Sequence, residues 1–321
     1  MTYKFIIFLK TLLMKNSMNI LAILVFSLST CATVEVEKKS LSDDDFNSYW
    51  YQGEAELSSY ELQQARYGEL RKGTAVMIFV TEDFWKNRQV KKESKQYESN
   101  DQAVNVLKLN FLKKFSTGIY DYSLMSSIFQ PVNLERFAHP LKINGTIQDW
   151  CGQVFYQMNY KKDAIHFQSR SYFEDEGDLE MTLAANYSED QIWNLIRINP
   201  NKLPVGKIDM IPSGFYTRLM HKEVQAYKAE ASILESHTEH GVNTYKISYA
   251  KLNRTMEIHY STTFPYMIEG WSETYVSGWG TSAKELISTA KRIKTMKSPY
   301  WRKNSVKDST LRKELLGPLS P

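Results

Sequence analysis

The chain has 321 residues, of which 42% are hydrophobic and 13% aromatic, so it can build a large folded core and is not a disordered polymer. Its net charge of +4 comes from the two ends: residues 1–30 contribute +3 and residues 284–321 contribute +7, which leaves −6 for the body between them. A nucleic-acid-binding protein carries its positive charge on a folded face, so this distribution excludes that class of function.

The first thirty residues have the pattern of an export signal. Lys15 supplies the positively charged n-region of such a signal, and Ile20 to Leu28 form its apolar region. This apolar run is too short to cross a bilayer, because a span needs roughly 20 residues. Leu28-Ser29-Thr30-Cys31 resembles the lipobox of a bacterial lipoprotein, in which the cysteine is acylated, although Thr30 departs from the usual Gly, Ala or Ser. The alternatives are a cleaved soluble signal and an uncleaved apolar anchor. We predict a signal peptide over residues 1–30 and lipidation at Cys31.

This signal places the protein in the cell envelope, attached to a membrane by lipid. In some bacteria an acidic residue directly after the acylated cysteine retains the lipoprotein at the inner membrane. Ala32 stands at this position, so the outer membrane is favoured. Residues 31–45 are polar and charged, which is typical of a flexible tether. Their acidic run, Asp43-Asp44-Asp45, is more typical of a solvated linker than of a cation site.

From residue 46 to residue 300 the dominant pattern is β. Apolar and polar residues alternate with period two in strand-length runs, and residues 229–276 have turns at His240-Gly241 and Asn253 that indicate an antiparallel meander. We predict a mainly β (β-rich α+β) domain built on a large antiparallel sheet, either curved or folded into a sandwich.

Two short helices are expected within this domain. Ser188 and Gln191 form a capping box before an apolar run, which predicts a helix over residues 188–197. Ser282 and Glu285 form a second capping box, and apolar residues at helical spacing behind it predict a helix over residues 282–295. The stretch 199–214, rich in Pro and Gly, is a candidate domain boundary, and we expect the basic polar tail 301–321 to fray.

Cysteine chemistry is limited, because the chain has two cysteines and Cys31 would be acylated. Redox chemistry of the thioredoxin type needs a second cysteine three residues after Cys151, where Val154 stands. A nucleophile formed by Cys151 with His139 or His166 stays open, because such partners meet only in space. We favour a buried, unreactive Cys151 at the end of a strand.

His237 and His240 are weak metal candidates. Their spacing is three residues, whereas a zinc-binding helix places two histidines four residues apart, and the Gly241 turn follows them directly. A polar hairpin rim explains them without a metal. No phosphate-binding, dinucleotide-binding or Gly-x-Ser-x-Gly motif occurs, so the sequence predicts no cofactor and no catalytic residue.

Aromatic side chains are the remaining candidates for a binding site. They could line a groove for sugar rings or acyl chains, although aromatic residues at this density more often pack in cores and at sheet edges. The candidate groove residues are Trp50, Trp85, Trp271, Tyr275 and Trp279.

Several segments together resemble a family of uncharacterised bacterial envelope lipoproteins, among them Gln64-Ala65-Arg66-Tyr67-Gly68-Glu69, Gln148-Asp149-Trp150-Cys151-Gly152 and Ile196-Arg197-Ile198-Asn199-Pro200. The resemblance extends over roughly residues 46–305. Members often carry the automated label "septum formation inhibitor Maf". True Maf pyrophosphatases have a Ser-x-Ser-Pro-Arg-Arg motif, and neither Ser-Pro pair of this chain is followed by two arginines. The resemblance therefore implies an envelope lipoprotein without Maf activity.

We expect a lipid-anchored, non-enzymatic protein that binds a lipid, a glycan or a partner protein of the envelope. Lipoprotein carriers with a half-open barrel over helices are the nearest architectural analogy. The alternative is an envelope hydrolase whose site is assembled from residues distant in sequence. A pocket that brings Cys151 to a histidine would favour the hydrolase, whereas a dry aromatic cavity would favour the binding protein.

Overall fold

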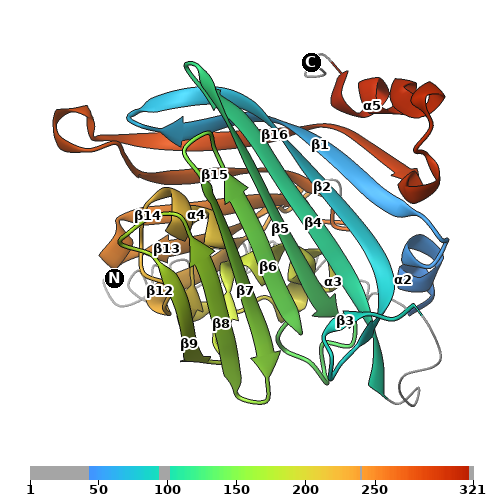
Figure 1. Cartoon of the computed structure of the whole chain (residues 1–321). Helices are drawn as coiled ribbons and strands as arrows, with labels where there is room; N and C mark the ends of the chain where they lie inside the picture. The colour runs from blue at the N-terminus through green and yellow to red at the C-terminus, as the bar shows by residue number, and fades with distance from the viewer. Residues whose placement is uncertain (1–42, 94–101, 239–240, 318–321) are drawn as a thin grey trace, which may run out of the picture. The chain divides into compact units, whose positions relative to one another are not determined.

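The computed structural model describes residues 43–93, 102–238 and 241–317. The predicted signal peptide, the lipidation site Cys31 and His240 lie outside the described residues. The described part is mainly β, as predicted, and its strands form one large curved sheet (Figure 1).

The strands follow one another along almost the whole described chain. They are β1 (Ala55–Arg66), β2 (Glu69–Trp85), β3 (Val90–Lys91), β4 (Ala103–Thr117), β5 (Tyr120–Pro131), β6 (Lys142–Gln148), β7 (Gln153–Lys161), β8 (Ala164–Ser171), β9 (Asp178–Ala184), β10 (Tyr187–Ser188), β11 (Gly206–Ile211), β12 (Tyr227–Leu234), β13 (Val242–Tyr249), β14 (Arg254–Ser261), β15 (Ile268–Ser277) and β16 (Lys284–Ser298). The helices are α2 (Asp43–Trp50), α3 (Glu189–Ile198), α4 (Gly214–Leu219) and α5 (Ser309–Leu316).

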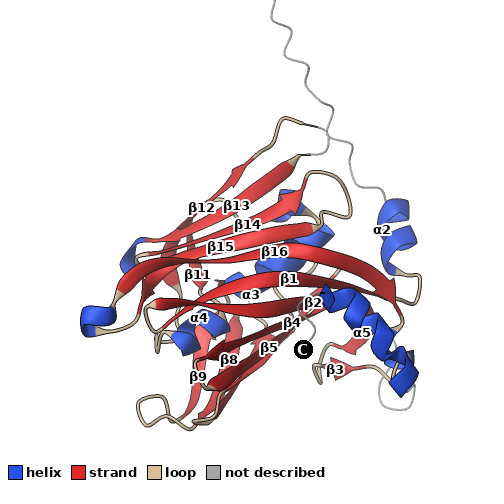
Figure 2. Ribbon diagram, turned by 90° about the horizontal axis from the view of Figure 1, so that it is seen from above, coloured by secondary structure: helices blue, strands red, loops and turns tan. Residues whose placement is uncertain are grey.

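The sheet is open, but its two edge strands lie close to each other in the chain. Its strand order is β10-β11-β12-β13-β14-β15-β16-β1-β2-β4-β5-β6-β7-β8-β9, with β3 paired to β2 outside this path. All pairs are antiparallel except β10 with β11. The two edge strands, β9 and β10, are consecutive in the chain and separated only by Ala185 and Asn186. The edges are therefore held together at one end, and the sheet curves around the space that it encloses (Figure 2).

Alternation of side chains gives each strand an inner and an outer face. In β7, Val154, Tyr156 and Met158 are buried on the inner face, while Gln153 and Phe155 point outward. Such period-two burial is what an antiparallel sheet with one covered face requires.

Two helices fill the concave side of the sheet. Every residue of α3 and of α4 is buried, and the two helices pack on β4, β5 and β6. The capping box predicted at Ser188 and Gln191 is present at the start of α3. Four aromatic rings meet between α3, α4 and the sheet, with centroids 5.3 to 5.6 Å apart: Phe111, Trp193, Phe215 and Trp271.

The buried helix α3 carries charged residues, and each end is tied to the sheet by an ion pair. At its start, both Glu189 oxygens accept from Arg254 of β14 at 2.6 Å, and Arg254 also reaches Glu273 of β15 at 2.7 Å. At its end, Arg197 donates two hydrogen bonds to Glu56 of β1, at 2.5 and 2.6 Å. Burying a charge without a partner is costly, and these pairs offset that cost at both ends of the helix.

The helix predicted over residues 282–295 is wrong, because this segment is the strand β16. Its apolar residues do recur at helical spacing, but the strand lies between β15 and β1 and takes its hydrogen bonds from both. Burial follows period two instead, with Ser288 and Ala290 on the inner face. Pairing with two neighbours outweighs a local capping signal.

The expectation of a fraying tail is also wrong for its described part. After two short 3-10 turns the chain forms α5, whose Leu315 and Leu316 are buried. Leu315 packs on Ala55, Leu57 and Val80, on the outer face of the sheet. The basic composition of this segment predicted a frayed tail. The two adjacent leucines instead give α5 an apolar contact with the sheet. Likewise, Asp43-Asp44-Asp45 does not lie in the tether but starts α2.

We predict that Arg254→Ala lowers the free energy of unfolding by about 3–5 kcal/mol, because it leaves Glu189 and Glu273 buried without their cation. Lys228→Ala is the matched control, since Lys228 and Asp209 form an exposed pair whose loss costs at most about 1 kcal/mol. Urea unfolding of both variants checks this. Equal losses would show that the buried cluster does not hold the helix.

We predict a pH dependence of stability that comes from Asp190 of α3. Burial raises the pKa of Asp190 to about 6, with Glu189 adding to the shift while Ser213, the Gly214 amide and Lys113 oppose it. Between pH 4 and 6 Asp190 is therefore more protonated in the folded state than in the unfolded chain, so the contribution of Asp190 to stability falls as pH rises, by up to about 3 kcal/mol.

Asp190→Asn removes this ionisation. The difference in free energy of unfolding between the variant and the wild type should therefore grow in favour of the variant from pH 4 to pH 7. Urea titrations at several pH values measure it, and a difference that stays constant with pH would contradict the assignment.

Candidate functional site

The structure separates Cys151 from the histidines considered as its partners. Cys151 is exposed on the β6–β7 turn, so the expectation of a buried cysteine is wrong. Its amide donates to Asp149 Oδ1 at 2.7 Å, which fixes the residue in a turn rather than in a strand. His139 lies just before the first residue of β6, whereas Cys151 follows its last residue. The seven residues of β6 separate the two side chains by roughly 23 Å. His166 is exposed on β8, opposite Asn159 near the far end of β7.

The metal candidates are not brought together either. His237 is exposed after β12. Within residues 43–93, 102–238 and 241–317, no three His, Cys, Asp or Glu side chains are placed to hold a metal ion. No helix in this same part of the chain is both long and apolar enough to cross a bilayer.

The five aromatic residues considered as a groove do not share one surface. Trp50, Trp85, Trp271 and Tyr275 are buried at 1–2% exposure, whereas Trp279 is 55% exposed on the β15–β16 turn. The buried four pack in the protein interior; Tyr275, for example, donates its hydroxyl to the Ala65 carbonyl at 2.6 Å.

The space enclosed by the sheet is occupied. A hollow beside Lys113, Glu189 and Arg254 has a volume of only about 10 Å³, close to the minimum for one water molecule. Lys113 lies here with its ammonium 5.3 to 5.5 Å from the ring centroids of Phe111, Phe215 and Trp271, and burial lowers its pKa. This hollow cannot hold a lipid chain or a sugar ring.

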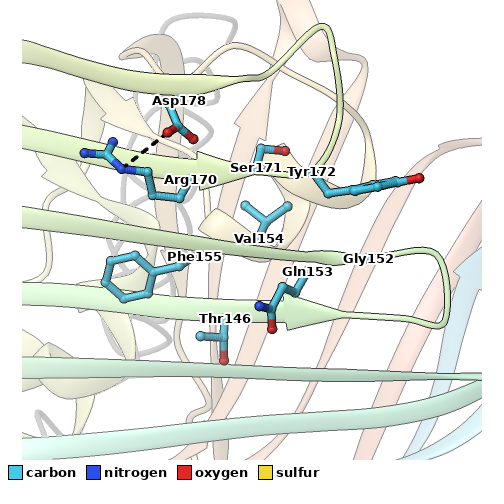
Figure 3. Close-up of a pocket in the computed structure, with 9 residues that line it drawn as sticks. All are labelled: Thr146, Gly152, Gln153, Val154, Phe155, Arg170, Ser171, Tyr172 and Asp178. Carbon is cyan, nitrogen blue, oxygen red and sulfur yellow. Dashed lines mark ion pairs between the residues drawn. The ribbon is translucent and has the colours of Figure 1, made fainter.

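A larger pocket lies on the outer face of the sheet, across β6, β7 and β8 (Figure 3). Its volume is about 560 Å³. Four of its residues form one row across neighbouring strands, in register with one another: Thr146, Phe155, Arg170 and Asp178. The other lining residues are Gly152, Gln153, Val154, Ser171 and Tyr172.

The aromatic wall of this pocket is an exposed ring that rests on a glycine. Tyr172 is 69% exposed at the end of β8. A Cβ at Gly152 would lie 2.7 Å from the Tyr172 ring, so the absence of a side chain allows the ring to lie against the β6–β7 turn. Phe155 adds a second aromatic surface on the outer face of β7.

The polar side of the pocket is held by ion pairs. Arg170 donates to Glu180 at 2.5 Å and lies 3.7 Å from Asp178 (Figure 3). The hydrogen bond to Glu180 raises the pKa of Arg170 further above its ordinary value, so the guanidinium stays charged. Ser171 donates to Glu176 at 2.8 Å, which fixes the turn that follows Tyr172. A planar ring and several hydrogen-bonding groups therefore share one shallow surface.

Sequence reasoning did not find these pocket residues. The available signal was Phe155, an aromatic side chain at an outward position of an alternating strand. Comparison of the chain with family models, with curated proteins and with solved structures finds no match. Function is therefore argued from the residues of this chain alone.

We predict that Gly152→Ala displaces the Tyr172 ring, because the new methyl group would overlap it, while the fold is kept since the ring is free to move into solvent. Nuclear Overhauser contacts between the Tyr172 ring and residue 152 should change, with a change in the free energy of unfolding below about 1 kcal/mol. Unchanged ring contacts would contradict the packing described here.

Proposed function

We propose that the protein is a non-enzymatic binding protein of the cell envelope, anchored by a lipid on Cys31, that binds a saccharide in the pocket of Figure 3. The observation that carries this proposal is the exposed Tyr172 ring, supported by Gly152, beside outward-pointing polar side chains. The outer membrane is the proposed location, on the sequence pattern around Cys31 and Ala32.

A saccharide suits this surface better than a lipid or a partner protein. A sugar ring has an apolar face of C–H groups and a rim of hydroxyls, so it needs an aromatic surface and hydrogen-bonding groups together. Tyr172 and Phe155 supply the former, and Gln153, Arg170 and Asp178 the latter. An acyl chain needs an enclosed apolar cavity. A stable protein partner needs roughly 800 Å² on each side, which favours a flat surface over a small pocket.

The hydrolase alternative gains no support from the positions of its candidate residues. Cys151 lies on the turn next to the pocket, but His139 and His166 are far along the strands from it. A nucleophile of this kind needs a base within hydrogen-bonding reach. We therefore do not extend the proposal to catalysis.

We predict that Tyr172→Ala weakens saccharide binding at least tenfold, because it removes the stacking surface. Tyr51→Ala is the matched control, since Tyr51 is also an exposed tyrosine but lies beyond α2, away from the pocket. A screen of immobilised envelope and model oligosaccharides finds the ligand, and titration calorimetry measures the dissociation constants. Equal affinities of the two variants, or no binding of any saccharide by the wild type, would rule out this site.

We predict that Cys31→Ser abolishes lipid attachment. Cells that express the full chain and are grown with an alkyne analogue of palmitate should label the wild type and not the variant, and only the wild type should sediment with membranes. Sedimentation of Cys31→Ser without label would indicate an uncleaved apolar anchor, and label that persists in Cys31→Ser would place the lipid on another residue; either result would contradict lipidation at Cys31 as the anchor.

A further inference from the structure

A second group of charged and aromatic side chains lies where several hairpin turns and the end of α4 meet. We refer to it as the arginine–aromatic cluster. Its residues come from the end of β1 and the turn after it, from β5, from the β8–β9 turn, from α4 and the turn after it, and from the β15–β16 turn. They are Arg66, Tyr67, Tyr122, Phe173, Glu176, Arg218, His221 and Trp279.

Arg66 is a buried cation with neutral hydrogen-bond partners. It is 5% exposed, and it donates to the hydroxyls of Tyr122 and Tyr67 at 3.1 Å and to the Leu219 carbonyl. Its guanidinium also lies over the Tyr67 ring, 4.2 Å from the centroid. Within the described residues no carboxylate lies within 4 Å of it, although buried charges are normally paired.

Arg218 is the second cation of the cluster, and its partners leave one donor unused. Its side chain is 7% exposed and stacks on the Phe173 ring at 3.9 Å. Its one carboxylate partner in the described part is Glu176 at 3.3 Å, and its buried Nε has no hydrogen-bond partner there. Burial lowers the pKa of Arg218 and the positive charge of Arg66 lowers it further, whereas Glu176 and, more weakly, Asp149 raise it.

The Glu176 carboxylate has further partners. Glu176 also accepts from Ser171 and pairs with the ring of His221, both at 2.8 Å. The Arg218 guanidinium and the His221 imidazole therefore share the Glu176 carboxylate, and Arg66 has no carboxylate partner among the described residues. Trp279 is 55% exposed, and the His221 side chain is 38% exposed, so the cluster can be approached from solvent on their side.

Two residues of the cluster have a strained backbone. Tyr67 has φ 57° and His221 has φ 50°, in the left-handed region that bulky side chains avoid. Such conformations are energetically unfavourable and concentrate at binding and active sites. Tyr67 is fixed by its hydroxyl, which lies 2.7 Å from that of Tyr122 and 3.1 Å from that of Tyr120.

We propose that the arginine–aromatic cluster binds an oxyanion, the phosphate or carboxylate group of a ligand, between Arg66 and Arg218. Guanidiniums bind both groups through paired N–H donors. The bound oxyanion would accept from the unused Nε of Arg218 and pair with Arg66, which has no carboxylate partner among the described residues. Trp279 and Phe173 provide apolar contacts for the rest of the ligand. This site is distinct from the pocket of Figure 3, and the proposal does not depend on saccharide binding there.

Titration calorimetry on the full chain in detergent tests this proposal, with glucose 6-phosphate and glucuronate as probes and glucose as the neutral control. We expect both anions to bind and glucose not to bind in this cluster. Arg66→Gln and Arg218→Gln should each lower the affinity for both anions at least tenfold. Vesicles of phosphatidylglycerol, compared with phosphatidylcholine, distinguish a lipid headgroup from a soluble ligand as the source of the oxyanion.

Glu176→Gln is the decisive variant, because a folding defect cannot imitate its effect. Removing the carboxylate that competes for Arg218 and His221 should strengthen anion binding at least threefold. Glu269→Gln is its control, since Glu269 pairs with Arg292 at 2.6 Å outside both proposed sites and should leave anion affinity unchanged. Failure of all the anionic probes to bind, or the same affinity in Glu176→Gln as in the wild type, would overturn the proposal.

Discussion

The burial of α3 with its charged side chains is the constraint on which the rest of the structure depends. A helix inside a curved sheet could be wholly apolar, but this one carries Glu189 at one end and Arg197 at the other. Each charge is matched by one position of the sheet, Arg254 on β14 and Glu56 on β1. Apolar contacts would allow the helix to slide or rotate, whereas these pairs fix its position, so we interpret them as determinants of a single arrangement.

The position of α3 decides where a ligand can bind. The predicted large curved sheet is present and contains helices, and the analogy with lipoprotein carriers supposes a half-open barrel over helices. However, a carrier of that kind needs an empty concave side, and here α3, α4 and four aromatic rings occupy it. Both proposed binding sites therefore lie elsewhere, on the outer face of the sheet and at its turns. There, residues such as Tyr172 and Trp279 are exposed even though apolar side chains of this size usually pack inside.

The sequence predicts those parts of the fold in which local and long-range preferences agree. Alternating strands and the capping box at Ser188 are local signals that the sheet and the buried helix then reinforce. Residues 284–298 carry a helical signal that pairing with β15 and β1 overrides. Neither candidate site could be predicted from the sequence. Thr146 and Asp178 line the same pocket only because of the registers of three strand pairs, β6–β7, β7–β8 and β8–β9, which the sequence does not reveal. Arg66, likewise, reaches the Leu219 carbonyl, next to Arg218, only in the folded protein.

The central claim is that ligands bind outside a filled sheet, and mapping of a bound saccharide by NMR tests it most directly. Chemical shifts of the isotope-labelled protein would be followed during titration with the oligosaccharide that binds most tightly. The account predicts that the largest changes occur at Gly152, Phe155, Arg170 and Tyr172. Changes centred instead on Phe111, Trp193 and Trp271 would show that the interior opens to admit the ligand, and would contradict the account.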